Sequence, residues 1–391
     1  MAAPHRTSVS LYDDEDEEDV LPTTNSEKKD ASADNGSSES IEIAPMQPTP
    51  VSLYDDLDAD APLPKKSRTD SPPTTATEKS EDSSGDAKQK SSTSTIPEGA
   101  VSHDVRRVLF SVTGARKGER PEMEDAHVSI AAVLAHDPPI ATRHSLYAIF
   151  DGHAGARASS YAEAHFARKL AANALQYKSL DAMEKSMKKI MVETYRAIDE
   201  AFLKDARVNK PAWKDGTTAS TLLVLNDTVY AANIGDSRAI VCRRKPNEEK
   251  FVIIELTVDH NPQKFEERQR IEKAGGVVKN GRVDGIIEVS RSIGDGQFKT
   301  RGVTCVPDLK KFSLTENDKF ILVACDGLWK AFTNESAVDF AWKKFNESAM
   351  DEDLMVGGAK ARWEWVAGEM AAEAVRRRCG DNVSLLIIVI S

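Results

Sequence analysis

The chain of 391 residues has only four cysteines, and they lie far apart. They are Cys242, Cys305, Cys325 and Cys379. This spacing provides neither the paired thiols of a zinc site nor a disulfide framework. We therefore expect a protein of a reducing compartment, which means the cytoplasm, the nucleus or both.

Long apolar runs are also absent. No stretch is long enough to span a bilayer, and the N-terminus lacks the apolar region of a secretory signal. A basic stripe with interleaved aromatic residues, which would favour nucleic acid, is missing as well. We therefore expect neither a membrane nor a nucleic acid among the partners.

Aromatic residues are scarce in the first hundred residues, which contain no phenylalanine or tryptophan. The same segment holds 22 acidic against 9 basic side chains and 10 of the 17 prolines, whereas the rest of the chain has a net charge of only +2. Such a segment cannot bury enough apolar surface to offset the entropy lost on ordering. The composition predicts a disordered acidic tail over residues 1–103 and a folded domain over residues 104–391.

One hexapeptide occurs twice in this acidic tail. Val9-Ser-Leu-Tyr-Asp-Asp14 returns as Val51-Ser-Leu-Tyr-Asp-Asp56. Leucine and tyrosine in acidic surroundings are typical of a short motif that docks on another protein, which here would be a kinase or another signalling protein. A duplicated spacer explains the repeat equally well, so both interpretations stay open.

The folded domain shows short apolar runs typical of strands and longer runs typical of helices. The run Ser145–Phe150 predicts a buried strand that ends at Asp151-Gly152-His153. We expect further strands at 107–112, 128–134, 218–225, 229–233, 239–242, 319–324 and 384–390, and helices at 155–176, 183–202, 262–274, 334–345 and 359–378. Antiparallel strands with helices in pairs predict an α+β fold of two packed sheets, with helices on both outer faces.

Glycines and turn residues set the expected boundaries. A turn from Gly114 to Gly118 should follow the first strand. The runs between Thr218 and Cys242 are separated by Asn226-Asp227 and Gly235-Asp236, which predicts a meander of hairpins.

Carboxylates recur where the predicted strands begin or end. Asp151 and Asp326 each follow a strand, Asp381 stands just before the last strand, and Glu124-Asp125 occupies the loop before another. Strand ends of one sandwich can converge on one edge, and clustered carboxylates repel one another unless cations lie between them. We expect no cysteine beside these oxygen ligands, which favours Mg²⁺ or Mn²⁺.

Taken in order, these segments resemble the metal-dependent type 2C Ser/Thr protein phosphatases. The resemblance covers residues 108–390. The matching blocks are Arg120…Glu122-Met-Glu-Asp-Ala-His127, Phe150-Asp-Gly-His-Ala-Gly155, Asp215-Gly-Thr-Thr-Ala219, Asn233-Ile-Gly-Asp-Ser-Arg238, Asp259-His-Asn-Pro262, Ala274-Gly-Gly276, Val289-Ser-Arg-Ser-Ile-Gly-Asp295, Ala324-Cys-Asp-Gly-Leu328 and Asp381-Asn-Val-Ser384.

The resemblance implies an α-β-β-α sandwich with two metal ions, Mg²⁺ or Mn²⁺, in a cleft between the sheets. The implied metal ligands are Asp151, which would bridge both ions, the carbonyl of Gly152, Asp326, Asp381 and, through bound water, Glu124 and Asp125. A hydroxide bridging the two ions would attack phosphorus in line.

The resemblance also implies roles for groups that bind no metal. Arg120 would grip two phosphoryl oxygens, and His153 would protonate the leaving serine or threonine oxygen as general acid. Asp215, Asp236 and Asp295 are expected to brace loops.

Lys330 departs from the family pattern. Many relatives carry aspartate at this position and use it to hold a third, weaker metal with the counterparts of Asp259 and Asp326. An ammonium cannot ligate a cation. Either Lys330 lies near Asp259 and Asp326 and replaces the charge of that third ion, or it points into solvent and leaves a weakened site. We expect the first arrangement.

The sequence thus predicts a monomeric hydrolase, a metal-binding protein phosphatase that removes phosphate from serine and threonine of phosphoprotein substrates in signal transduction. One alternative is a catalytically weak phosphatase fold that acts as an adaptor through its acidic tail. A second is a metallohydrolase of small phosphoesters, which would share the metal chemistry. The presence of Arg120, Asp151, His153, Asp326 and Asp381 argues against the adaptor.

Overall fold

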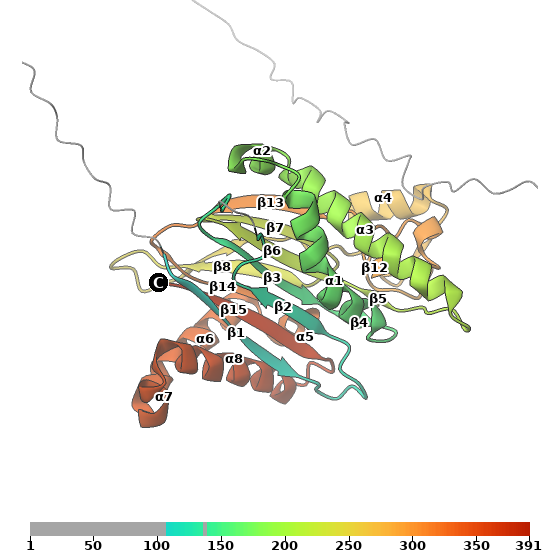
Figure 1. Ribbon diagram of the computed structural model, residues 1–391. Helices are drawn as coiled ribbons and strands as arrows, with labels where there is room; N and C mark the ends of the chain where they lie inside the picture. Colours follow the sequence, from blue (N-terminus) through green and yellow to red (C-terminus); the bar gives the residue numbers. More distant parts are fainter. Residues whose placement is uncertain (1–106, 136–138) are drawn as a thin grey trace, which may run out of the picture. The chain divides into compact units, whose positions relative to one another are not determined.

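Two five-stranded sheets make up the centre of the computed structural model, which describes residues 107–135 and 139–391 (Figure 1). The predicted disordered tail, residues 1–103, lies outside the described residues. Both copies of the hexapeptide lie there too, so these expectations stay predictions.

All neighbouring strands within the two sheets run antiparallel. The first sheet has the order β1-β15-β14-β8-β9. Its strands are β1 (Leu109–Arg116), β15 (Val383–Ile390), β14 (Asp318–Ala324), β8 (Arg238–Arg243) and β9 (Val252–Glu255). The second sheet has the order β13-β7-β6-β3-β2. Its strands are β13 (Asp308–Ser313), β7 (Thr228–Ile234), β6 (Ala219–Leu225), β3 (His144–Phe150) and β2 (Ala126–Ile130).

Alternation along the central strands sends side chains into two different apolar layers. In β15, Leu385 and Ile387 pack with residues of the helices, whereas Leu386 and Ile388 pack against the second sheet. All eight residues of β15 are buried, as its continuous apolar sequence predicted.

Helix pairs cover the outer faces of both sheets (Figure 1). Helices α1 (Arg157–Ala174) and α3 (Met187–Val208) bury their apolar faces on the second sheet. Helices α6 (Asn334–Glu347) and α8 (Gly358–Arg376) do the same on the first. The predicted α-β-β-α sandwich is therefore confirmed.

Shorter elements complete the described part. The helices are α2 (Leu180–Lys185), α4 (Phe265–Lys273), α5 (Asp326–Ala331) and α7 (Glu352–Val356), with single 3₁₀ turns at Lys299–Arg301 and Ser348–Met350. The short strands are β4 (Gly152–His153), β5 (Gly216–Thr217) and β12 (Ile293–Gly294) in one sheet, and β10 (Val278–Lys279) with β11 (Arg282–Val283) in another. Among the described helices, none has both the length and the apolar character needed to cross a bilayer.

Two expectations about the strands were wrong. Gly114 lies inside β1, where a β-carbon would come within 2.1 Å of the Ala367 carbonyl oxygen of α8. Glycine therefore serves close packing of helix on strand here, and β1 continues to Arg116. The meander also breaks, because β7 belongs to the second sheet and β8 to the first. The Gly235-Asp236 connection crosses between the sheets.

Candidate metal centre

Strand ends from both sheets converge on one cavity of about 430 Å³. Asp151 follows β3 of the second sheet, Asp326 follows β14 of the first, and Asp381 precedes β15. All three line the cavity together with Gly152, Arg120 and His153. The fold thus brings together six of the residues that sequence analysis selected.

Three carboxylates at this cavity are close enough to share a cation. One oxygen each of Asp151, Asp236 and Asp326 lie within 4.8 Å of one another. Sequence analysis had placed Asp236 among the loop braces. It joins the cluster because the crossover from β7 to β8 carries it between the two sheets, directly over the cavity that it lines.

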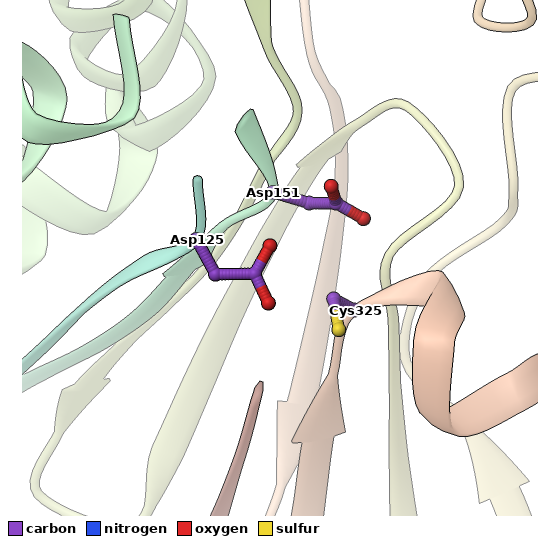
Figure 2. A group of neighbouring side chains, drawn as sticks. All are labelled: Asp125, Asp151 and Cys325. Atoms are coloured by element: carbon purple, nitrogen blue, oxygen red, sulfur yellow. The ribbon is translucent and has the colours of Figure 1, made fainter. Parts of the chain in front are cut away.

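A second group lies beside Asp151. One ligand atom each of Asp125, Asp151 and Cys325 lie within 4.8 Å of one another. Figure 2 shows the Asp125 carboxylate and the Cys325 thiol pointing into the same space, with the Asp151 carboxylate next to them. The expectation of no cysteine beside the carboxylates was therefore wrong. Burial raises the pKa of the Cys325 thiol well above its usual value, so this sulfur stays protonated and is a poor metal ligand.

Burial and mutual repulsion raise the pKa values of these carboxylates. Burial, followed by the charges of Asp125 and Asp326, raises the pKa of Asp151 well above its usual value. Burial and the Asp326 charge raise the pKa of Asp236 to about 7. Burial also raises the pKa of Asp125 to about 6. A divalent cation between these groups would relieve both the lost hydration and the repulsion.

Two side-chain cations already contact the cluster. The Lys330 ammonium lies 2.6 Å from Asp326 Oδ2 and 2.7 Å from Asp381 Oδ2. Burial alone would lower the pKa of Lys330, but Asp326 and Asp381 raise it above its usual value. Arg120 Nη2 lies 3.0 Å from the Asp381 carboxylate. Lys330 thus contacts Asp326, and it lines a second cavity together with Asp259, whose carboxylate pairs with Arg238 at 2.6 Å.

The Glu124-Asp125 loop is also held at the site through its backbone. A β-carbon on Gly152 would lie 2.2 Å from the Glu124 carbonyl oxygen, so glycine is what lets the loop pack against β4. The Glu124 amide donates to Asn382 Oδ1 at 2.9 Å, next to Asp381. Among the described residues that line the cavity, neither Glu124 nor Asp125 appears. This position fits contact with an ion through water.

The residues fit a hard divalent cation. The donors are carboxylate oxygens, as Mg²⁺ and Mn²⁺ prefer, and the nearest thiol is neutral. Asp125 Oδ2 is buried and has no hydrogen-bond partner among the described residues. A buried oxygen without a donor is costly unless a cation or a cation-bound water satisfies it.

The chain matches the family described as Protein phosphatase 2C over residues 111–383. It is 45% identical over 287 residues to the integrin-linked kinase-associated serine/threonine phosphatase 2C of Bos taurus. This match covers 72% of this chain and 77% of the bovine protein. It is 37% identical over 284 residues to the probable protein phosphatase 2C 67 of Oryza sativa subsp. japonica, covering 70% of this chain and 73% of that one.

A solved structure agrees with the fold. The serine-threonine phosphatase 2C from Toxoplasma gondii superposes with a TM-score of 0.58 at 21% sequence identity, over 72% of this chain and 95% of that chain. At this identity the likeness shows the architecture alone.

Proposed function

The chain belongs to the protein phosphatase 2C family of serine/threonine phosphatases, and from this premise we propose how it works. Its cleft carboxylates hold two divalent cations, Mg²⁺ or Mn²⁺, and the enzyme hydrolyses phosphoserine and phosphothreonine in proteins. The observation that carries the proposal is the convergence of Asp151, Asp326 and Asp381 with Arg120 and His153 on one cavity.

The proposed ligand set follows the geometry of the cluster. Asp151 lies nearest the centre, because it belongs to both groups of close carboxylates. It would contact both ions, and the Gly152 carbonyl, Asp326 and Asp381 would complete direct ligation. Glu124 and Asp125, which do not line the cavity, would act through bound water. When bound, two such ions supply a water that is deprotonated near neutral pH and can attack phosphorus.

Two side chains of the cavity would handle the substrate. The Arg120 guanidinium is half-exposed, and only some of its five N–H donors bond to Asp381 and to the Gly380 carbonyl. The remaining donors can bind two phosphoryl oxygens at once. His153 lines the same cavity and would give its proton to the serine or threonine oxygen that leaves.

The substrates would be phosphoproteins, and the acidic tail would recruit a partner. Relatives at 44–45% identity are named for an association with integrin-linked kinase. We propose that a kinase or another signalling protein binds this chain through its repeated hexapeptide, in the cytoplasm or the nucleus. The adaptor alternative finds no support in the cavity, because Asp151, Asp326 and Asp381 are all in place.

Ligand variants test the proposed site. Asp151→Asn, Asp326→Asn and Asp381→Asn should each reduce kcat on a phosphothreonine peptide with Mn²⁺ on the order of 10²-fold or more, because each removes a charge that balances the cations. The matched control is Asp227→Asn, whose carboxylate pairs with Arg107 and Arg143. Circular dichroism would check the fold of each variant.

The control should keep its activity. A folded Asp151→Asn variant with near wild-type turnover would show that the ligand is assigned wrongly. Loss of activity in Asp227→Asn as well would mean that the losses reflect general destabilisation.

A further inference from the structure

The sheet of β12, β5 and β4 brings His153 against a buried carboxylate. His153 of β4 pairs with Gly216 of β5, and Gly294 of β12 pairs with the same glycine from the other side. Asp295 directly follows β12 and lies 2.7 Å from His153 Nε2 through its Oδ2. Both side chains line the catalytic cavity.

The geometry points to Asp295 as the positioning residue of His153, an inference that rests on the proposed phosphatase function. Since His153 Nε2 bonds Asp295, the Nε2–H is donated to a carboxylate that only accepts. Nδ1 is then the nitrogen left to face the substrate. Asp295 thereby fixes the ring orientation and selects the nitrogen that carries the transferred proton.

Asp295 is itself held by its surroundings. Its side chain is 2% exposed, and Ser292 Oγ donates to the same Oδ2 at 2.6 Å. Its amide donates to the Asp215 carbonyl oxygen at 3.0 Å. The backbone of Asp295 has φ of 52°, a left-handed conformation that aspartate tolerates better than most residues. The carboxylate is therefore fixed before a substrate arrives.

Gly216 leaves the space that this hydrogen bond needs. A β-carbon there would lie 2.0 Å from Asp295 Oδ2 and 2.4 Å from His153 Nε2. Both distances are far shorter than a van der Waals contact, so the bond can form only over a residue without a side chain.

A buried ion pair supports the same loop from helix α3. Asp199 Oδ1 accepts from the Gly294 amide at 2.7 Å and lies 3.0 Å from Lys299 Nζ. Lys299 also donates to the Ser292 carbonyl oxygen at 2.8 Å. The loop that carries Asp295 is thus fixed on both sides of the aspartate, which a simple surface turn would not require.

The step that depends on this pair is the cleavage of the phosphoester. As the oxygen derived from water forms its bond to phosphorus, the bond between phosphorus and the serine or threonine oxygen breaks. The electron pair stays on that oxygen, which takes the proton from His153 Nδ1. The products are inorganic phosphate and a free hydroxyl group, and the neutral imidazole keeps its Nε2 proton on Asp295.

Leaving-group dependence tests this inference. A nitrophenolate leaves without a proton, whereas an alkoxide needs one. Asp295→Asn should lower kcat about 10²-fold on a phosphothreonine peptide but less than about 3-fold on p-nitrophenyl phosphate. His153→Ala should show the same difference between the two substrates. The double variant should lose no more than His153→Ala alone, because the two residues act as a unit. Mn²⁺ affinity, measured by calorimetry, should stay unchanged in Asp295→Asn.

Asp215→Asn is the matched control, since Asp215 is equally buried beside Gly216 but bonds Arg157 instead of His153. Any loss in this variant should be equal on both substrates. Equal losses on both substrates in Asp295→Asn, or additive losses in the double variant, would overturn the positioning role. A wild-type protein that hydrolyses neither substrate with Mn²⁺ would instead refute the proposed function itself.

A spectroscopic readout needs no variant of Asp295. The ¹⁵N shifts of the His153 imidazole in the Mg²⁺-loaded wild-type protein, assigned by their absence in His153→Ala, should show a protonated Nε2. An unprotonated Nε2 would contradict the inference even if Asp295→Asn failed to fold.

Discussion

Lys330 places a positive charge between two carboxylates of the proposed metal centre. Its ammonium lies 2.6 Å from Asp326 and 2.7 Å from Asp381. It therefore lowers the repulsion between these groups and also repels a cation that approaches them. The balance of the two effects determines how tightly the cavity binds divalent ions.

Two substitutions of Lys330 should strengthen metal binding in different ways, one by raising the affinity and the other by adding a site. Lys330→Ala should bind Mn²⁺ about tenfold more tightly, because an ammonium no longer repels the ion, but should gain no additional site. Lys330→Asp should add a third divalent site, because it places another carboxylate beside Asp236 and Asp326. Calorimetric titration of the three proteins measures affinity and stoichiometry, with Lys319→Ala as a control for net charge.

A third site of equal affinity in the wild-type protein and in Lys330→Asp would contradict this account of Lys330. A change of the same size in Lys319→Ala would attribute the effect to the overall charge of the protein, since Lys319 lies at the start of β14.

At the scale of single residues, sequence analysis selected side chains by their position at strand ends. This was sufficient for Asp151, Asp326 and Asp381, which all line the cavity. It missed Asp236, because its loop has the sequence of an ordinary hairpin turn and only the crossover between sheets brings it to the cluster. Nor could it find the partner of His153, since Asp295 lies 142 residues away in sequence.

At the scale of elements, two glycines serve close contacts of different kinds. Gly114 of β1 lies against the backbone of α8. A β-carbon at this position would lie 2.1 Å from the Ala367 carbonyl oxygen. Gly216 of β5 lies against two side-chain ends, His153 and Asp295. Backbone packed in a helix cannot move aside, and the Asp295 carboxylate is buried and held by Ser292, so neither glycine leaves room for a β-carbon.

Alanine at either glycine should therefore lower stability, but only alanine at Gly216 should disturb the pair of His153 and Asp295. Gly114→Ala should lower the free energy of unfolding by about 1–3 kcal/mol, because β1 must move away from α8. Gly216→Ala should lose both stability and activity on phosphopeptides, because the alanine pushes the buried Asp295 carboxylate away from His153 and Ser292, whereas folded Gly114→Ala should keep its activity. Urea unfolding and phosphopeptide assays of both variants check this.

Either of two results would contradict the packing argument. A stable Gly114→Ala protein would mean that α8 is not held against β1 at this glycine. A fully active Gly216→Ala protein would mean that the bond between His153 and Asp295 is dispensable.

Element prediction from the sequence worked best in the interior of the sheets. Strands with continuous burial, such as β14 and β15, were predicted to within one residue. The edge strands β9 and β13 were missed. The exposed edge strand β13 carries charged residues such as Lys310 and Lys311 instead of an apolar run, whereas β9 is only four residues long. Helix α5 begins at Asp326, where the sequence Asp326-Gly327 had suggested only the end of a strand.

At the scale of the whole molecule, protons and divalent ions should compete for the same carboxylates. The pKa of Asp125 is raised to about 6 and that of Asp236 to about 7, both from 3.8. Without metal, the folded protein therefore binds more protons than the unfolded chain between about pH 4 and pH 7. The contribution of these groups to stability falls as pH rises through this window.

Two measurements check the sign. In chelator, the free energy of unfolding should fall between about pH 5 and pH 7.5, and it should fall less in Asp236→Asn than in the wild-type protein. The difference between the two falls should be on the order of a few kcal/mol at most. The rise in Tm on adding Mg²⁺ should be larger at pH 7.5 than at pH 5 in the wild-type protein, because the ion binds the ionised carboxylates. A larger Mg²⁺ effect at pH 5 would contradict the assignment of the cluster as the metal site.

The arrangement of layers could be predicted because each part of the sequence is consistent with it. Buried strands, paired amphipathic helices and the family motifs all indicate two sheets between helix pairs. The order of strands within each sheet could not be predicted, because an apolar run carries no information on which other strand it pairs with. That order decides which strand ends meet, and hence which carboxylates share the cavity.

The central claim is that the cleft carboxylates serve metal-dependent hydrolysis of phosphoserine and phosphothreonine. The most direct test measures phosphate release from phosphoserine and phosphothreonine peptides by the full chain, with Mn²⁺, with Mg²⁺ and with chelator. The account predicts turnover with either ion, near-complete loss in chelator and recovery when the ion is returned. Full activity in chelator, or none with either ion, would contradict it.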